Sequence, residues 1–252
     1  MSTKCNLDKK SAWHAHVVTL FPNMFPGPLS YSVVGKALSA GRWTLSTTNI
    51  RDFGLGSHRT VDGTPSGGGP GMVMRCDVLA SAIDHARKTE SGLQGIYLSP
   101  RGEKLTPQLV KDLILSPGLL LVAGRFEGID QRIIERRKLR EISIGDYVLS
   151  GGELAAMVLI DACVRRITGV LGSDMSLDQE SFEGKLLEYP HYTQPREWES
   201  LKIPEILLSG NHSKISAWRL RQSEKLTRAR RPDLLGPITC KHTTPSDDID
   251  NI

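Results

Sequence analysis

Three glycine-rich segments each follow a short apolar run in the middle of the chain. They are residues 97–102 (YLSPRG), 123–130 (AGRFEGID) and 143–154 (SIGDYVLSGGEL). In a parallel sheet, ligands bind beyond the carboxyl ends of the strands, and glycine lets backbone N–H and C=O groups approach a ligand closely. The three segments therefore predict one ligand pocket at a sheet edge, although each could also be an ordinary tight turn.

Several familiar signatures of nucleotide, hydrolase and metal chemistry are missing from the sequence. It has no GxxxxGK[ST] loop, no GxGxxG opening a helix and no GxSxG, which disfavours a Walker-type NTPase, a conventional dinucleotide fold and a serine hydrolase. The glycine run at residues 67–71 contains Pro70, which lacks an N–H donor, so it is a poor phosphate cradle. The four cysteines are scattered, and no spacing indicates a metal site.

Polar residues around the most apolar helical segment, residues 152–167, have structural explanations. Ser150 and Glu153 match a capping box, with Ser150 as N-cap and Glu153 reaching back to it, so Glu153 is expected to be structural. Asp161 and Arg165 are spaced for an ion pair within the helix. Arg165 also adjoins a polar linker, where a phosphate or a substrate oxygen could meet it.

Positive charge is concentrated near the carboxyl end of the chain. The net charge is +4, and residues 211–235 carry seven Lys and Arg against two acidic residues, so this segment alone contributes +5. Such a segment indicates contact with a polyanion, although a solvated helix face is the commoner explanation of a charge run. At helical spacing one stripe of the segment collects Lys214, Arg221, Lys225 and Arg228.

The first two-thirds of the sequence alternates strand-like and helix-like segments, with a long loop at residues 52–74. Strands are expected at residues 16–21, 43–50, 96–99, 119–123 and 141–144. Helices are expected at residues 31–40, 76–88, 106–115, 130–138 and 152–167. This alternation predicts an α/β fold with a mainly parallel sheet. No apolar run is long enough for a membrane span, and the amino-terminal residues do not resemble a secretory signal.

The remainder of the chain has a different character. Residues 169–192 are polar and weakly periodic and are typical of a linker, and the segment from Pro204 onward is helical and basic. The predicted organisation is an extension (1–15), an α/β domain (16–168), the linker (169–192), a small helical domain (193–236) and a disordered tail (237–252).

The motifs together resemble one family. VVTLFPNMF, YLSPRG, GRFEGID, SIGDYVLSGGE, GVLG, LLEYPHYTQP and SGNHSKISAWRLRQSEKLTRARRPDLL occur in order between about residues 16 and 235. They resemble the TrmD family, the bacterial tRNA (guanine-37-N1)-methyltransferases. The resemblance implies a SPOUT-type α/β fold with a deep trefoil knot, beside the small all-α carboxyl-terminal domain that the sequence pattern predicts. It also implies a homodimer, S-adenosylmethionine as methyl donor, and a tRNA with guanosine at position 37 preceded by guanosine. The scattered cysteines favour a reducing cytoplasm as the setting.

Matching motif by motif, the resemblance assigns the three glycine-rich segments to the donor pocket. The residues concerned are Tyr97, Leu98, Ser99, Pro100, Gly124, Phe126, Glu127, Gly128, Ser143, Ile144, Gly145, Tyr147, Leu149, Gly151 and Gly152. It places a general base in the linker, which maps to Glu180, and brings Arg165 and His191 near the target base. The expected tRNA contacts are therefore His191 with Lys214, Arg219, Arg221, Lys225 and Arg228.

The sequence departs from the usual family pattern at two of these positions. Glu180 stands where most members have aspartate, and the extra methylene displaces the carboxylate by about 1.5 Å, an error that can reduce the rate by about 10²-fold. Asp178 is the other candidate base. Phe126 stands where tyrosine is usual. Mg²⁺ could assist the reaction, but no residues identify its site.

The chemistry implied is removal of the guanine N1 proton by Glu180, with Arg165 stabilising charge on O6 or binding a phosphate. Three other functions remain open. One is a related SPOUT enzyme that methylates ribose 2′-hydroxyls, and another is an RNA-binding protein that has lost catalysis, which only the Glu180 departure supports. The third is a nucleotide-binding enzyme unrelated to RNA, which the basic segment argues against.

Overall fold

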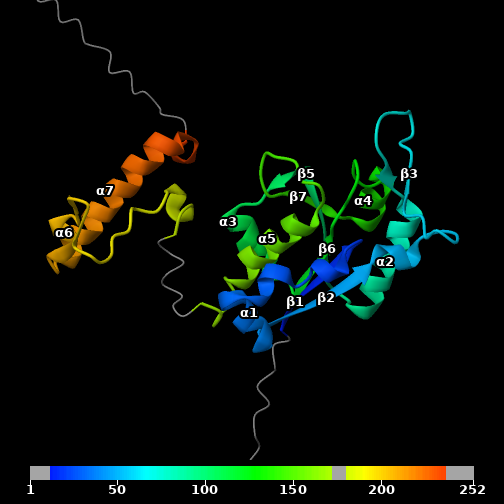
Figure 1. The fold of residues 1–252 in the computed structure, drawn as a ribbon, viewed down its shortest axis with the longest axis horizontal. Coiled ribbons are helices and arrows are strands. Elements are labelled where there is room, and N and C mark those ends of the chain that lie inside the picture. Colours follow the sequence, from blue (N-terminus) through cyan, green and yellow to red (C-terminus); the bar gives the residue numbers. More distant parts are fainter. Residues whose placement is uncertain (1–11, 172–179, 237–252) are drawn as a thin grey trace, which may run out of the picture. The chain divides into compact units, whose positions relative to one another are not determined.

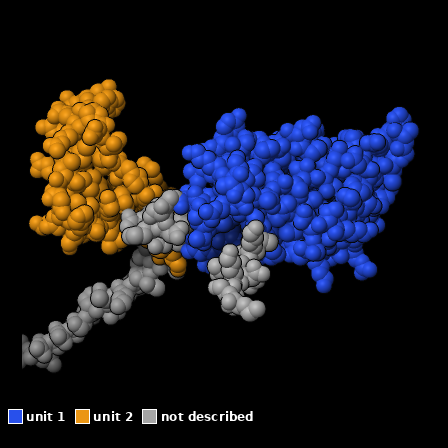
Figure 2. Space-filling model, turned by 90° about the horizontal axis from the view of Figure 1, so that it is seen from below, with its two compact units in different colours: residues 1–174 blue, residues 175–252 orange. Residues whose placement is uncertain are grey.

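The computed structural model describes residues 12–171 and 180–236. The chain divides into two compact units, with the boundary between residues 174 and 175 (Figure 2). This boundary lies inside the predicted linker, residues 169–192. Asp178, the alternative base, and the predicted disordered tail lie outside the described residues.

The first unit is built on one five-stranded parallel sheet. Its strands are β1 (Trp13–Thr19), β2 (Trp43–Asn49), β5 (Gln94–Lys104), β6 (Gly118–Val122) and β7 (Arg140–Ser143). Their order across the sheet is β2-β1-β6-β5-β7, and every neighbouring pair is parallel. The predicted α/β fold with a parallel sheet is therefore confirmed.

Helices cover both faces of this sheet, because alternate strand residues point to opposite sides. Ala15, Val17 and Leu119 join one buried cluster, whereas Val18 and Leu120 join the other. One face carries α1 (Ser32–Ser39), α3 (Pro107–Leu113) and α5 (Glu153–Val164), with the short turns η1 (Pro22–Met24) and η2 (Gly27–Ser30). The other carries α2 (Cys76–Thr89) and α4 (Gln131–Arg137) (Figure 1).

The first strand begins earlier than expected. β1 starts at Trp13, which pairs with Trp43, so its first residues belong to the sheet and not to an extension ending at residue 15. The polar side chains of His14 and His16 obscure the strand pattern in the sequence. Both are satisfied by hydroxyl groups on β2, which is why they can lie in a sheet interior.

The expected strand at residues 96–99 is also longer in the structure. β5 runs to Lys104, but Leu98 and Glu103 both lie opposite Ile142 on β7. The four residues between them leave the ladder as a bulge. This bulge forms most of the first glycine-rich segment and turns it away from the sheet.

The long segment expected as a loop, residues 52–74, contains some regular structure. After η3 (Ile50–Phe53), the short strands β3 (Asp62–Gly63) and β4 (Val73–Met74) pair antiparallel. Met74 also forms a parallel bridge with Ile129. The end of this segment therefore lies beside the second glycine-rich segment.

The second unit is mainly helical. Its described elements are η5 (Glu183–Lys185), β8 (Glu197–Trp198), β9 (Leu201–Lys202), α6 (Glu205–Leu208), α7 (His212–Arg230) and η6 (Pro232–Leu235). The antiparallel pair β8–β9 corrects the expectation of an all-α domain. The N-cap of α7 is Asn211, whose side chain accepts a hydrogen bond from the Lys214 N–H at 3.1 Å.

None of the helices formed by residues 12–171 and 180–236 is both long enough and apolar enough to cross a membrane.

Candidate functional site

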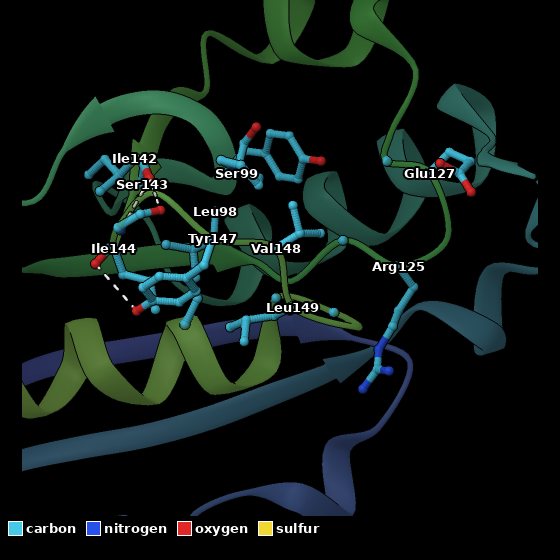
Figure 3. A pocket seen from close by; sticks show the side chains of 18 of the residues that line it. Leu98, Ser99, Arg125, Glu127, Ile142, Ser143, Ile144, Tyr147, Val148 and Leu149 are labelled. Atoms are coloured by element: carbon cyan, nitrogen blue, oxygen red, sulfur yellow. Dashed lines mark hydrogen bonds between the residues drawn. The ribbon is translucent and has the colours of Figure 1, made fainter.

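The three glycine-rich segments meet around one pocket at the carboxyl ends of β5, β6 and β7 (Figure 3). We call residues 97–102 the first loop, 123–130 the second loop and 143–154 the third loop. The space free of protein atoms is about 740 Å³, a value that includes open solvent at the mouth. All the residues predicted for the donor pocket line it, and so do Arg125, Ile142, Val148 and Ala155.

The first and second loops are packed together through Tyr97. Its side chain is only 6% exposed, and burial raises the pKa of its hydroxyl. A Cβ atom on Gly124 would lie 2.9 Å from the Tyr97 ring, so glycine is needed for this close packing. Ser99 is also buried, and its Oγ accepts a hydrogen bond from the Arg101 N–H at 3.2 Å. These contacts fix two adjoining walls of the pocket.

A tight turn opens the third loop. The Ser143 Oγ accepts a hydrogen bond from the Gly145 N–H at 3.3 Å and donates one to the Gly145 carbonyl at 3.1 Å. Gly145 has a φ of +155°, and a Cβ there would lie 2.5 Å from the Tyr147 ring. The Tyr147 hydroxyl approaches the Ile144 carbonyl at 3.5 Å. Glycine at position 145 therefore lets the tyrosine fold back over the turn, beside the pocket.

The second loop is held on its outer side by the end of the glycine-rich run. The Glu127 N–H donates to the Met72 carbonyl at 3.0 Å, and the Met74 N–H donates to the Gly128 carbonyl at 2.9 Å. A Cβ on Gly71 would lie 2.4 Å from the Glu127 carboxylate. Glu127 also lines the pocket, but its carboxylate lies beside Gly71, on the outer side of the loop.

The expected capping box is absent. The N-cap of α5 is Gly152, and no side chain caps the helix. Glu153 is instead fully buried and turned toward Thr19 and Arg125. The expectation failed because the capping pattern is local, whereas these partners come from distant segments of the chain. Glu153 is structural, as expected, but by another route.

Four residues of the pocket wall were not predicted from the sequence. Arg125 stands between two predicted residues of the GRFEGID motif, and Val148 stands between Tyr147 and Leu149, so both could have been found from their place in the motifs. Ile142 and Ala155 are a strand and a helix residue whose apolar character predicts only burial.

A second hollow lies in the second unit, between residues 190–193 (PHYT) and α7. Aromatic and positively charged side chains line this hollow, and His191 is one of its lining residues. The rings of Tyr192 and Trp218 contact each other edge to face. His191 lies 2.9 Å from the Glu188 carboxylate and 5.1 Å from the Tyr189 ring centroid. The Arg219 guanidinium lies 4.7 Å from the same ring, within the range of a cation–π contact.

The predicted tRNA contacts on α7 separate into two groups. Arg219 is half-buried in the hollow with His191, whereas Lys214, Arg221, Lys225 and Arg228 are exposed. Arg221, Lys225 and Arg228 lie beside one shallow groove that also includes Glu224. The exposed residues form a positively charged face of α7. The half-buried Arg219 lies beside aromatic rings, and a base could stack on such a combination of a cation and rings.

A family model described as tRNA (Guanine-1)-methyltransferase TrmD matches residues 13–237 of this chain. The chain belongs to the TrmD family. The match extends from the first residue of β1 to just beyond η6, so it covers both compact units of this TrmD-family protein.

Relatives named tRNA (guanine-N(1)-)-methyltransferase resemble the chain over almost their whole length. The one from Mesorhizobium japonicum is 58% identical over 222 residues, which cover 88% of this chain and 96% of the relative. One from Rhodopseudomonas palustris is 59% identical, with 88% of this chain and 89% of the relative covered. One from Chelativorans sp. is 57% identical, with 88% and 94% covered.

The two residues predicted for catalysis in this TrmD-family chain lie in different compact units. Arg165 is the C-cap of α5 in the first unit and is half-buried. Glu180 is half-buried in a bend near the start of the described part of the second unit. Just after it, the Ser181 Oγ accepts a hydrogen bond from the Glu188 N–H at 3.0 Å, which closes a short loop. Their joint action on a substrate stays a prediction.

Within the described ranges, no three His, Cys, Asp or Glu side chains gather in a way that could hold a metal ion. A divalent ion is therefore not assigned to any group of residues in the TrmD-family pocket.

Proposed function

We propose that this TrmD-family protein transfers the methyl group of S-adenosylmethionine to N1 of guanosine at position 37 of tRNA. The observation that carries the proposal is the convergence of the three loops on one pocket, in a chain whose relatives are named tRNA (guanine-N(1)-)-methyltransferase. A tRNA substrate also places the activity in the cytoplasm.

The chemistry of the pocket wall suits S-adenosylmethionine. Leu98, Ile144 and Leu149 offer apolar surface to the adenine ring, and the glycines expose backbone N–H and C=O groups that could hydrogen-bond its edge. When bound, the donor supplies an electrophilic methyl group on a sulfonium, so the protein needs no redox cofactor.

The protein must also make guanine N1 nucleophilic, because that nitrogen carries a proton. We assign removal of the proton to Glu180 and stabilisation of the negative charge that develops toward O6 to Arg165. The support for this assignment is their place in the family motifs. Reaction at a base within the anticodon loop requires that the base be turned out of its stack.

The second unit offers two surfaces for the tRNA. The exposed cations Lys214, Arg221, Lys225 and Arg228 suit the phosphates of the anticodon arm. The hollow with His191 and Arg219 suits an unstacked base, because aromatic rings and guanidinium groups stack on bases.

We further propose that the protein works as a homodimer. Leu154 and Val158, one helical turn apart on α5, are 51% and 48% exposed, and Val148 in the third loop is 83% exposed. Apolar side chains on a helix otherwise buried in the core fit a surface covered by a second copy.

The family's trefoil knot is proposed for the segment from β5 to α5. The support for this proposal is the strand order. The chain passes from β5 to β6 and then to β7, and β7 pairs with the edge of β5 opposite to β6, so the chain must cross over β5 between β6 and β7.

Mass spectrometry of nucleosides from digested tRNA tests the proposed reaction. After incubation with S-adenosylmethionine, we expect 1-methylguanosine as the new nucleoside. A 2′-O-methylated nucleoside instead would favour the ribose methyltransferase, and donor binding without any methylated product would favour an RNA-binding protein that has lost catalysis.

A further inference from the structure

Glu153, the first residue of α5, carries a carboxylate with no exposure to solvent. A buried carboxylate is costly unless it is paired. Here the Thr19 hydroxyl at the end of β1 donates to Glu153 Oε1 at 2.8 Å, and Arg125 Nε lies 2.9 Å from Glu153 Oε2. The Nε–H bond of the Arg125 side chain does not point at Glu153 Oε2. The contact between these two atoms is therefore an ion pair and not an aligned hydrogen bond.

Arg125 connects three segments of the first unit. It belongs to the second loop, its Nη1 donates to the Ser150 carbonyl of the third loop at 3.2 Å, and its guanidinium lies 4.4 Å from the centroid of the Phe21 ring, just after β1. In Figure 3 its side chain runs away from Ser99. The guanidinium therefore contacts Ser150 and Phe21, which do not line the pocket.

The third loop is shaped around this arginine. A Cβ on Gly151 would lie 2.2 Å from Arg125 Nε, and one on Gly152 would lie 2.8 Å from the Ala123 backbone. The Gly152 N–H also donates to the Gly124 carbonyl at 2.9 Å. The backbone of the third loop thus lies directly against the second loop, at the place where Arg125 is held.

We infer that Glu153 and Arg125 are positioning residues for the pocket. Glu153 fixes the guanidinium, and the guanidinium fixes the third loop at Ser150 and Gly151, next to Val148 and Leu149 in the pocket wall. The pair therefore sets donor affinity through the shape of the third loop. This inference rests on the proposed function, because the ligand is taken to be S-adenosylmethionine.

Three variants separate positioning from mere stability. R125K keeps the positive charge but not the planar fork, so one ammonium group cannot serve both Glu153 and the Ser150 carbonyl. E153Q leaves the guanidinium without its counter-charge. The double variant R125M/E153Q contains no unpaired buried charge, but it has no side chain that reaches Ser150. R137M is the control, because Arg137 pairs with Asp84 at 2.6 Å on α2 and does not line the pocket.

Isothermal titration with S-adenosylmethionine and thermal melting should be measured on all of these full-length proteins. We expect the donor Kd to rise about 10-fold or more in R125K, E153Q and the double variant, and to stay within about twofold of wild type in R137M. The melting temperature should fall in E153Q and recover in the double variant, whereas the donor Kd of the double variant should stay raised.

Two results would overturn the inference while the wild type still binds the donor. One is a wild-type Kd in both R125K and the double variant. The other is a Kd that follows the melting temperature through the series, since the pair would then contribute only to stability. A wild-type protein that does not bind S-adenosylmethionine would instead refute the proposed function itself.

Discussion

His16 shows how strongly a single buried side chain depends on its partners. Its two ring nitrogens form hydrogen bonds with Ser46 and Thr48 on β2, at 2.7 Å each. Burial, with added repulsion from His14 and His85, lowers its pKa from 6.5 to about 4, although Glu90 opposes the shift. The imidazole therefore stays neutral in the folded protein over a range in which the unfolded chain takes up a proton.

This shift predicts that the protein loses stability in mild acid. The folded pKa lies below the unfolded one, so the unfolded chain binds more protons from about pH 6.5 down to about pH 4, and stability falls as the pH drops through that window. His16 alone should reduce the free energy of unfolding by about 2 kcal/mol between about pH 7 and about pH 5.

Urea unfolding at both pH values measures the effect. The variant H16Q, which cannot titrate, should show a flatter pH dependence, and H58Q, at an exposed histidine, should behave as wild type. An unchanged slope in H16Q would contradict the assignment to His16.

At the same scale, the variant E180Q tests the proposed base. It should lower the rate constant of methyl transfer by about 10²- to 10⁴-fold, because the amide cannot accept the guanine N1 proton, and it should leave the donor Kd unchanged. Single-turnover methyl transfer and donor titration measure the two quantities. Full activity in E180Q, with activity lost in D178N, would transfer the role to Asp178.

At the scale of elements, the three loops depend on glycines at contact points. The variant G151A should raise the donor Kd by about 10-fold or more, because the new methyl group would meet Arg125 Nε at 2.2 Å and displace the third loop. The variant G63A is the matched control, since a Cβ there meets nothing within 4 Å. Titration of both proteins with the donor measures the effect. Equal donor affinities would show that the contact between residue 151 and Arg125 does not shape the pocket.

The elements of the first unit were largely predictable from the sequence, because buried strands and amphipathic helices leave local patterns. The exceptions depend on distant partners. Trp13 and His14 belong to β1 because β2 pairs with them, and Glu153 is turned inward by Thr19, which is 134 residues away. Even the bulge in β5 is defined by the register of β7 against it. No local pattern carries that information.

The wall of the pocket was predictable in another way. Apolar runs followed by glycine-rich segments indicated a shared edge of the sheet, and the resemblance to the TrmD family supplied the individual residues. What neither route supplied was the role of Arg125, because its meaning comes from the simultaneous contacts with Glu153, Ser150 and Phe21.

At the scale of the whole molecule, the proposed homodimer predicts a sharp effect of charge on α5. The double variant L154E/V158E should sediment as a monomer, because two carboxylates would be buried at the interface. L115E is the matched control, since Leu115, just after α3, is 84% exposed and is not part of the proposed interface. Analytical ultracentrifugation distinguishes the two, and a variant L154E/V158E that stays dimeric would contradict the proposed surface.

Methyl transfer to one guanosine beside the anticodon can be tested with two unmodified tRNA transcripts. They differ only in guanosine or adenosine at position 37, and each is incubated with the protein and methyl-labelled S-adenosylmethionine. We predict that label enters only the guanosine transcript and is recovered as 1-methylguanosine. Equal labelling of both transcripts, or no labelling of either despite donor binding, would contradict methyl transfer to guanosine 37.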